Sequence, residues 1–487
     1  MKQWKKIISL LIVFAMMSLL AMPAVADRDE QDDPTHTETE ETAADASDAE
    51  DETDAEAAEE KNETDAADQE TDADTGSDVA EEETDGTHEE LIAEGPVTLD
   101  LWEEDSEARK MLEDYVAAVT DPEGEEFIPE ADRIAVFDLD GTLFCETDPL
   151  YLEWLLYVKR AMFDPDSNPS DEDVELCRDI AAGILNGKLS DELEMRQIEA
   201  ETRVFAGMTY ADYVQYVRDL CALPCYGYEN MTVGEAFYQP MVQVVDYLND
   251  NGFKCYVVSG SGRSFIRTVS ENALDIPKAQ FIGTDTWVVA SGQEEWNGGE
   301  YVFQQGDELV LSDELVLKNI KMNKILQMME TIGQKPVLSF GNSSGDLSMA
   351  EFVCWDNEYD AMAFMLCCDD TERENGNPEK AAKMEDTCIE YGFVPVSMKN
   401  DWTTIYGEDV VRKEMDPIDE KLEPEEQIDE MLSRLETFFH AEAPLKPQDY
   451  AGKIIEAYKN GELTEDEVME AILKLYAAIE KEPEEEE

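Results

Sequence analysis

Ile134-Ala135-Val136-Phe137-Asp138-Leu139-Asp140-Gly141-Thr142-Leu143 places a short apolar run directly before two aspartates and a glycine. Such a run is typical of a buried strand, and ligands bind at the carboxyl ends of strands in open α/β sheets. Two carboxylates this close repel each other by roughly 4 kcal/mol at about 4 Å and an effective dielectric of about 20, so a cation or a proton is expected between them. The alternative is an acidic hairpin turn, for which Asp-Gly is common.

The chain after this stretch alternates between helical and strand patterns. Short apolar runs follow predicted helices at Cys255–Val258 and Pro336–Phe340, and further runs occur at Ala361–Cys367 and Phe393–Ser397. Phe281–Leu311 is β-rich. We therefore predict an α/β fold built on a doubly wound parallel sheet, which makes the acidic hairpin turn the weaker interpretation.

A helical block interrupts this alternation between Tyr151 and Leu220, where apolar residues recur every three or four positions. We predict an all-α insert at residues 145–234 within a core formed by residues 95–144 and 235–410. An acidic helical tail is expected at residues 411–487. Its first helix would carry an apolar stripe made of Ile428, Met431, Leu432, Leu435 and Phe438.

The N-terminal region reads as a targeting segment followed by a spacer. Three lysines precede an apolar run at residues 7–22 and then Ala24-Val25-Ala26, a pattern typical of a secretory signal peptide at residues 1–26. Residues 27–94 are almost all Asp, Glu, Thr and Ala, which predicts a disordered acidic tether, with weak cation or cell-wall binding as the alternative. We expect a secreted, extracytoplasmic protein without a stable membrane anchor after cleavage.

Charge and histidine content exclude several functions. The chain has 118 acidic and 36 basic residues and a formal net charge of −82, which argues against nucleic acid as a partner. Its three histidines, His36, His88 and His440, lie outside the predicted core. Mechanisms that need an imidazole in the core are therefore excluded, and carboxylate, amine, hydroxyl and thiol groups remain.

Two predicted loops carry groups suited to phosphoryl chemistry. At the first, Asp138 is a candidate nucleophile, and Asp140 is a candidate general acid that later acts as a base. At the second, Ser259 and Gly260 begin a Ser-Gly-Ser-Gly turn before a helix, where a hydroxyl and backbone amides bind phosphate oxygens. The alternative for Ser259 is a plain helix N-cap.

A third loop and a nearby lysine complete the set. Asn342 and Asp346 offer an amide oxygen and a carboxylate, which suit Mg²⁺, although the same loop by itself would be an ordinary polar turn. A lysine from the preceding helix is expected to balance the charge and bind phosphate. We select Lys321, with Lys318 as the nearest rival and Lys324 third; each alone would more often be a solvated surface charge.

These motifs together resemble a known family. Phe137-Asp138-Leu139-Asp140-Gly141-Thr142-Leu143 resembles the first motif of the haloacid dehalogenase superfamily. Ser259, Lys321 and the Asn342–Asp346 loop follow in the order of its second, third and fourth motifs. The resemblance covers residues 134–406, and the helical insert resembles the small cap of the phosphoserine-phosphatase-like branch.

The resemblance implies a Mg²⁺-dependent phosphatase acting on a small phosphorylated substrate. It implies an aspartyl-phosphate intermediate on Asp138 and protonation of the leaving group by Asp140. It also implies a magnesium ion held by Asp138, the Asp140 main-chain carbonyl, and the loop of Asn342 and Asp346. An aspartate at position 140 favours a phosphatase over the branches that cleave carbon–halogen bonds or use ATP for transport.

Two departures from the family pattern bear on function. Many relatives have an acidic residue where Asn342 stands, so metal binding would lean on Asp346. Phosphoserine-specific members have a glutamate that would align near Thr147, whereas here Glu146 lies one residue earlier, which argues against phosphoserine as the substrate. Two alternative functions stay open: a non-catalytic surface protein that binds cations or a cell-envelope partner, and a phosphotransferase that uses an acceptor other than water.

Overall fold

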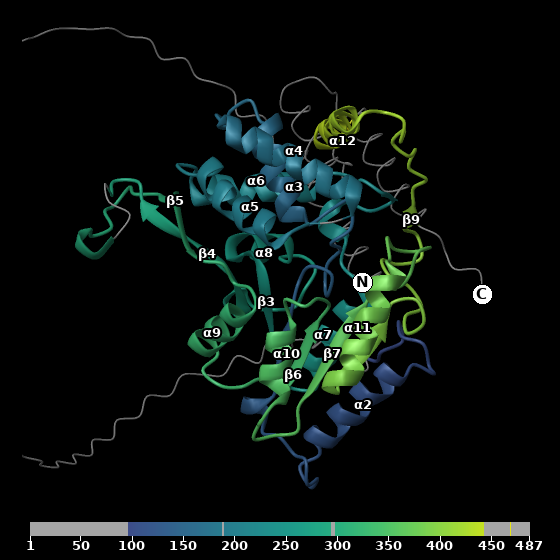
Figure 1. Ribbon diagram of the computed structural model, residues 1–487. Helices are drawn as coiled ribbons and strands as arrows, with labels where there is room; N and C mark the ends of the chain where they lie inside the picture. Colours follow the sequence, from purple (N-terminus) through teal and green to yellow (C-terminus); the bar gives the residue numbers. More distant parts are fainter. Residues whose placement is uncertain (1–95, 188, 294–297, 443–467, 469–487) are drawn as a thin grey trace, which may run out of the picture. The chain divides into compact units, whose positions relative to one another are not determined.

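The computed structural model describes residues 96–187, 189–293, 298–442 and 468 (Figure 1). The predicted signal peptide and acidic tether lie outside the described residues, as does nearly all of the tail beyond residue 442. The part considered below belongs to one compact unit, Glu94–Asp449. Within the described residues, no helix combines the length and the apolar character needed to cross a bilayer.

A seven-stranded sheet in the order β5-β4-β3-β1-β6-β7-β8 forms the centre of this unit. All neighbouring strands are parallel except β4 and β5, which form an antiparallel pair at one edge. The first strand, β1, lies between β3 and β6. The strand bounds are β1 Ile134–Phe137, β3 Lys254–Gly262, β4 Phe281–Ala290, β5 Leu309–Leu317, β6 Leu338–Gly341, β7 Met362–Cys367 and β8 Val394–Ser397.

Helices cover both faces of the sheet, which confirms the doubly wound α/β architecture. On one face, Ala135 and Phe137 of β1 belong to the same buried cluster as residues of α2 and α7. On the other, Val136 packs in a cluster with Met328 of α9 and Met349 of α10. The helix bounds are α2 Glu107–Thr120, α7 Gln239–Asp250, α8 Arg263–Val269, α9 Met322–Thr331, α10 Leu347–Cys354 and α11 Pro378–Tyr391.

Aromatic packing fixes the middle of the sheet. The ring of Phe340 stacks on Phe137 with centroids 4.5 Å apart and on Phe364 at 5.1 Å. Each such pair adds about 0.5–1.5 kcal/mol beyond the area it buries. This stack holds β1, β6 and β7 in register just before the loops that carry the predicted site residues.

The helical insert follows β1 as predicted and forms a cap of four α-helices with one π-helical segment. Its elements are α3 Leu152–Val158, η2 Lys159–Phe163, α4 Asp171–Asn186, α5 Asp191–Val204 and α6 Tyr210–Cys221. Ser170 and Asp173 form a capping box that starts α4. The predicted apolar stripe of the tail lies on α12, Pro424–Phe439, which packs against α4.

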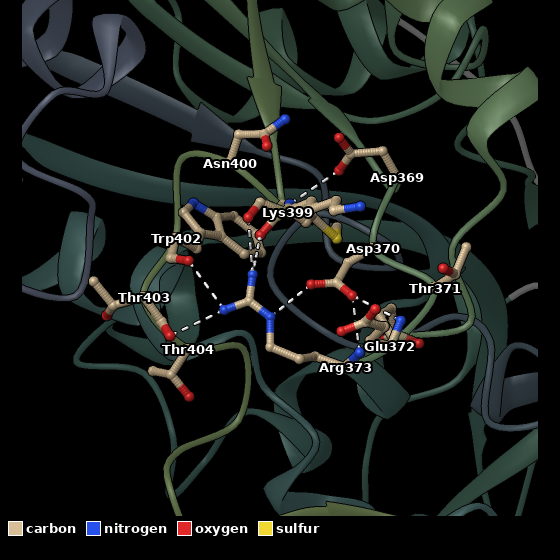
Figure 2. A network of polar contacts seen from close by, with 12 residues as sticks. Asp369, Asp370, Thr371, Glu372, Arg373, Lys399, Asn400, Trp402, Thr403 and Thr404 are labelled. Carbon is tan, nitrogen blue, oxygen red and sulfur yellow. Dashed lines mark hydrogen bonds and ion pairs between the residues drawn. The ribbon is translucent and has the colours of Figure 1, made fainter.

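Arg373 ties together two loops beyond the carboxyl ends of β7 and β8 (Figure 2). Its guanidinium donates to Oδ2 of Asp370 at 2.6 Å and to the carbonyl oxygens of Trp402 at 3.0 Å and Thr403 at 2.9 Å. Two further bonds reach the carbonyls of Met398 and Lys399. One planar side chain with five donors thus fixes an irregular backbone that has no ladder of its own.

The next residue, Glu374, connects these loops to the start of the cap. Its buried carboxylate accepts hydrogen bonds from Thr147 Oγ1 at 2.5 Å, from the hydroxyl of Tyr228 at 2.9 Å and from the hydroxyl of Tyr406. A buried carboxylate with several donors is satisfied without a counter-charge. These three hydrogen bonds to Glu374 therefore fix the start of the cap to the core.

Candidate active site

The loop after β1 places two aspartates in the interior. Asp138 and Asp140 are only 7% and 9% exposed, and the backbone amide of Asp138 donates to the carbonyl of Phe340 at 2.9 Å. This bond continues the pairing of β1 with β6 by one residue. The first and third predicted loops therefore lie side by side at the carboxyl edge of the sheet.

Lys324 bridges these two loops. Its Nζ lies 2.6 Å from Oδ1 of Asp138 and 2.6 Å from Oδ1 of Asp346, and the residue is 2% exposed. Burial lowers the pKa of this amine, but the two carboxylates outweigh burial and raise the pKa above its usual value. Lys324 is therefore a charged amine between two carboxylates.

The sequence analysis selects Lys321 as the lysine that balances the charge of the aspartates. In the structure Lys324, its third candidate, occupies that position instead. The helix α9 begins only at Met322, and Lys321 is its exposed N-cap with a positive φ of 51°. Lys324 lies on the buried face of α9, one turn before Met328. Lys318 is buried as well, but its amine lies 3.5 Å from Glu194 of the cap.

Asp346 shapes the third loop. Its Oδ2 accepts hydrogen bonds from the backbone amides of Asn342 at 3.2 Å and Ser343 at 3.1 Å, and from the Ser343 hydroxyl at 3.0 Å. With Oδ1 on Lys324, both oxygens already have partners. Asp346 thus holds the loop and orients the lysine, whereas the sequence had placed it mainly among the metal ligands.

The second loop holds Asp140 through two serines. The hydroxyl of Ser261 donates to Oδ2 of Asp140 at 2.8 Å, and that of Ser259 is farther away at 3.4 Å. Ser259 Oγ instead accepts from the amide of Ser261 at 3.0 Å. The strand β3 continues through Ser259 and Gly260 to Gly262, so these residues extend the sheet where a helix start was expected. Ser261 is a site residue that the sequence motif did not single out.

The environment of both aspartates disfavours negative charge. Burial raises the pKa of Asp140, and hydrogen bonds from Ser261 offset only part of this effect. Burial and the neighbouring Asp346 also raise the pKa of Asp138, which Lys324 partly counteracts. Retaining a proton suits Asp140 as a general acid, whereas the contact with Lys324 favours the ionised form of Asp138.

Gly141 brings a glutamate and an amide together beside these aspartates. Its φ is +81°, and a Cβ at this position would lie 1.9 Å from Nδ2 of Asn342 and 2.6 Å from Cδ of Glu146. Only glycine fits this conformation and this space. Burial raises the pKa of Glu146 to about 7, although a hydrogen bond from Asn342 lowers it. Glu146, not Thr147, is therefore the first cap residue at the site.

These carboxylates form a setting suited to a divalent cation. Lys324 pairs with Asp138 and Asp346, and Oδ1 of Asp140 is buried with no hydrogen-bond partner in the described part of the chain. Within the described residues, no group of three or more His, Cys, Asp or Glu side chains is arranged to hold a metal ion by itself. Mg²⁺ requires less, since it is usually bound through one or two carboxylates and keeps several waters.

Part of the chain matches a known protein family. Residues 135–351 match the family of haloacid dehalogenase-like hydrolases. No curated protein matches the chain.

Three solved structures are similar to the chain at low identity. One is a protein with unknown function from Bordetella pertussis Tohama I, at 14% identity and a TM-score of 0.36, covering 54% of this chain and 97% of that one. A phosphoserine phosphohydrolase-like protein from Francisella tularensis subsp. tularensis SCHU S4 is 15% identical, with a TM-score of 0.30 and coverages of 52% and 92%. A probable phosphoserine phosphatase from Vibrio cholerae is 13% identical, with a TM-score of 0.28 and coverages of 53% and 60%.

Proposed function

We propose that this chain, whose residues 135–351 match the family of haloacid dehalogenase-like hydrolases, is a Mg²⁺-dependent phosphatase that hydrolyses small phosphate monoesters. The observation that carries the proposal is the bridge of Lys324 between Asp138 and Asp346. A carboxylate held by a fixed amine at the edge of a parallel sheet is oriented for attack on phosphorus.

The first half-reaction uses the two aspartates in turn. An oxygen of Asp138 forms a bond to phosphorus while the ester oxygen leaves with the bonding electrons. Asp140, held by Ser261, donates its proton to that leaving oxygen. The product alcohol departs, and the phosphoryl group remains on Asp138 as an acyl phosphate.

The second half-reaction restores the enzyme. Asp140, now ionised, takes a proton from a water molecule. The oxygen of this water attacks phosphorus, and the bond between phosphorus and Asp138 breaks. Inorganic phosphate leaves, and both aspartates return to their starting states. Lys324 keeps Asp138 in place throughout and balances the charge that moves on and off it.

Asp138, Asp140 and Asn342 would hold the magnesium ion. Bound there, the ion would reduce the repulsion between the buried carboxylates and the phosphate dianion. Asp346 contributes indirectly, because its hydrogen bonds to the amides of Asn342 and Ser343 fix the loop. Ser259 and Gly260 keep their predicted role in phosphate binding, and the Ser259 hydroxyl would turn from its long contact with Asp140 to donate to a phosphate oxygen.

Export is the second part of the proposal. The lysines at the start of the chain, the apolar run at residues 7–22 and the Ala24-Val25-Ala26 sequence support secretion. Detecting the protein outside the cytoplasm with Asp27 as its first residue would support this part. Retention of residues 1–26 in the mature protein would contradict it.

Phosphate release by the purified chain tests the activity. We expect hydrolysis of p-nitrophenyl phosphate that requires added Mg²⁺ and stops with a chelator. Asp138→Asn should lose at least about a thousandfold in rate, because the amide cannot form the acyl phosphate. Activity that survives this substitution would exclude the covalent role, and a chain inactive on all phosphate esters would favour the non-catalytic alternative.

A further inference from the structure

A cavity of about 230 Å³ lies between the cap and the core, beside the proposed active site. Its walls come from α3, α5 and α6 of the cap, from α8, and from the hairpin of β4 and β5. Six residues matter for the argument: Glu153, Glu201, Phe205, Tyr210, Tyr213 and Gly262. Figure 1 shows this hairpin extending from the sheet alongside α5 and α8.

Main-chain hydrogen bonds close the cavity on the hairpin side. The amide of Gly207 donates to the carbonyl of Leu311 at 2.9 Å, and the amide of Leu311 donates to the carbonyl of Met208 at 2.9 Å. The segment between α5 and α6 thus pairs with β5 in the manner of a strand. Backbone contacts therefore fix the wall of the cavity that faces β5.

The cavity adjoins the group that would protonate the leaving oxygen. Glu153 Oε1 accepts a hydrogen bond from the amide of Gly262 at 2.5 Å. The neighbouring residue, Ser261, donates to Asp140. A substituent on the leaving alcohol would extend from Asp140 toward this space.

The cavity wall holds carboxylates without a matching cation. Glu153 and Glu201 are 1% and 6% exposed, and neither forms an ion pair with any described residue. Glu201 Oε2 accepts only from Nε2 of Gln197, at 2.6 Å. The charge of Lys318 lowers the pKa of both acids, but burial outweighs it, and the amine itself lies 3.5 Å from a third acid, Glu194.

The arginines of the wall are engaged elsewhere. Arg263 forms two bonds of 2.7 Å to the carboxylate of Asp285, and Arg267 donates from Nε to the carbonyl of Lys278. A bidentate pair is satisfied and has little tendency to bind a further anion. Of the two guanidinium groups, that of Arg263 is paired with an acid, and that of Arg267 is bound through Nε alone among the described residues. Neither is hydrogen-bonded to Glu153 or Glu201, which are the buried acids of the wall.

Aromatic rings complete the wall. The rings of Phe205 and Tyr213 meet edge to face with centroids 5.1 Å apart, and Tyr210 adds a third aromatic side chain. Ring faces attract an ammonium group by about 0.5–2 kcal/mol, and buried carboxylates attract it further. Rings together with unpaired acids describe a site for an organic cation.

We propose that this cavity binds the cationic end of the leaving alcohol, so that the preferred substrates are phosphate esters of amino alcohols that carry no carboxylate. This inference rests on the proposed phosphatase function and specifies its substrate class. Glu201 and Glu153 would pair with the ammonium group, and the three rings would enclose its alkyl substituents.

A selectivity measurement tests the proposal. We expect kcat/KM for phosphoethanolamine and phosphocholine to exceed that for glycerol phosphate and phosphoserine by about tenfold or more, in line with the strength of such contacts. Glu201→Gln should remove most of this preference. Glu199→Gln on the same helix, where the side chain is exposed, should keep the wild-type ratio.

A binding measurement separates this proposal from the phosphatase function. Choline or ethanolamine should raise the melting temperature of the wild-type chain and of Asp138→Asn, but not that of Glu201→Gln. Hydrolysis of p-nitrophenyl phosphate without any preference for the cationic esters would overturn the cavity proposal alone. Absence of hydrolysis with all esters would overturn the phosphatase function, and absence of the thermal shift would then overturn the cavity proposal too.

Discussion

The amine of Lys324 lies 2.6 Å from a carboxylate oxygen of Asp138, in a place that solvent barely reaches. The same amine lies equally close to Asp346. A buried ion pair is strongly destabilised when one member is removed, because the other remains as an uncompensated charge. The contact therefore matters for folding as well as for the proposed chemistry.

Replacing this lysine should have two effects. Lys324→Met leaves two buried carboxylates without their amine, so we expect the free energy of unfolding to fall by about 3–5 kcal/mol and phosphate release to be lost. Urea unfolding and a phosphate assay measure these effects. Lys321→Met, at the exposed N-cap of α9, is the matched control. If Lys321→Met lowered stability and phosphate release more than Lys324→Met does, Lys321 would be the lysine that supports Asp138.

The proposed acid can be tested by varying the leaving group. Asp140→Asn should slow hydrolysis of alkyl phosphates by about 100- to 10,000-fold, because an alkoxide leaves poorly without a proton. The loss should be smaller in the first half-reaction for p-nitrophenyl phosphate, whose leaving group needs little protonation. Single-turnover rates for both esters give the comparison, and equal losses would argue against proton donation by Asp140.

The amide at position 342 should limit metal affinity. Asn342→Asp adds a negative charge beside Glu146, so we expect a lower melting temperature without metal. The same added charge should increase the rise in melting temperature that Mg²⁺ produces, and should lower the half-saturating Mg²⁺ concentration by about tenfold or more. A substitution that leaves the Mg²⁺ response unchanged would show that this side chain is not a ligand.

Glu153 should make the stability of the protein depend on pH. Burial raises the pKa of Glu153 from 4.5 to about 7. The ionisable groups that act on this side chain are Lys318, Asp140 and Glu201. The folded chain thus holds this proton more tightly than the unfolded chain, so the contribution of Glu153 to the free energy of unfolding falls as the pH rises through that interval. Glu153→Gln should reduce this slope in urea titrations by the contribution of one group, and Glu146, whose pKa is also raised to about 7, should maintain the rest. The exposed Glu192→Gln should leave it intact.

Arg373 should be replaceable by neither lysine nor methionine. Its fork reaches one carboxylate and four carbonyl oxygens, and a single ammonium group cannot reproduce that geometry (Figure 2). We expect Arg373→Lys to reduce the free energy of unfolding by about 2–3 kcal/mol or more, since hydrogen bonds to charged groups contribute about 1.5–3 kcal/mol each. A loss below about 0.5 kcal/mol would contradict this structural role.

The sheet and its edge could be predicted because local pattern and tertiary position agree there. A buried strand has to end in a loop, and in a parallel sheet those loops meet at one edge. Asp138, Ser259 and Asp346 follow from that rule. In the structure Lys324 joins Asp138 to Asp346, and Ser259 lies 3.4 Å from Asp140. The cap helices were predictable for the same reason, since their apolar spacing is regular.

The lysine was harder to select because residues 318, 321 and 324 are spaced three apart along the chain. Which of them faces the aspartates depends on where α9 begins, and a positive φ at Lys321 delays that start. Glu153 and Glu201 could not be selected from the sequence for a different reason. Their role depends on how the cap packs on the core, and apolar periodicity in the sequence does not predict that packing.

The backbone pairing between β5 and the segment at Gly207 and Met208 constrains how a ligand reaches the interior. A cap that swung away as a rigid body would have to break these main-chain bonds. Otherwise it must carry the β4–β5 ribbon along with it. Any such opening of the cap would therefore involve β4 and β5 as well as the cap helices.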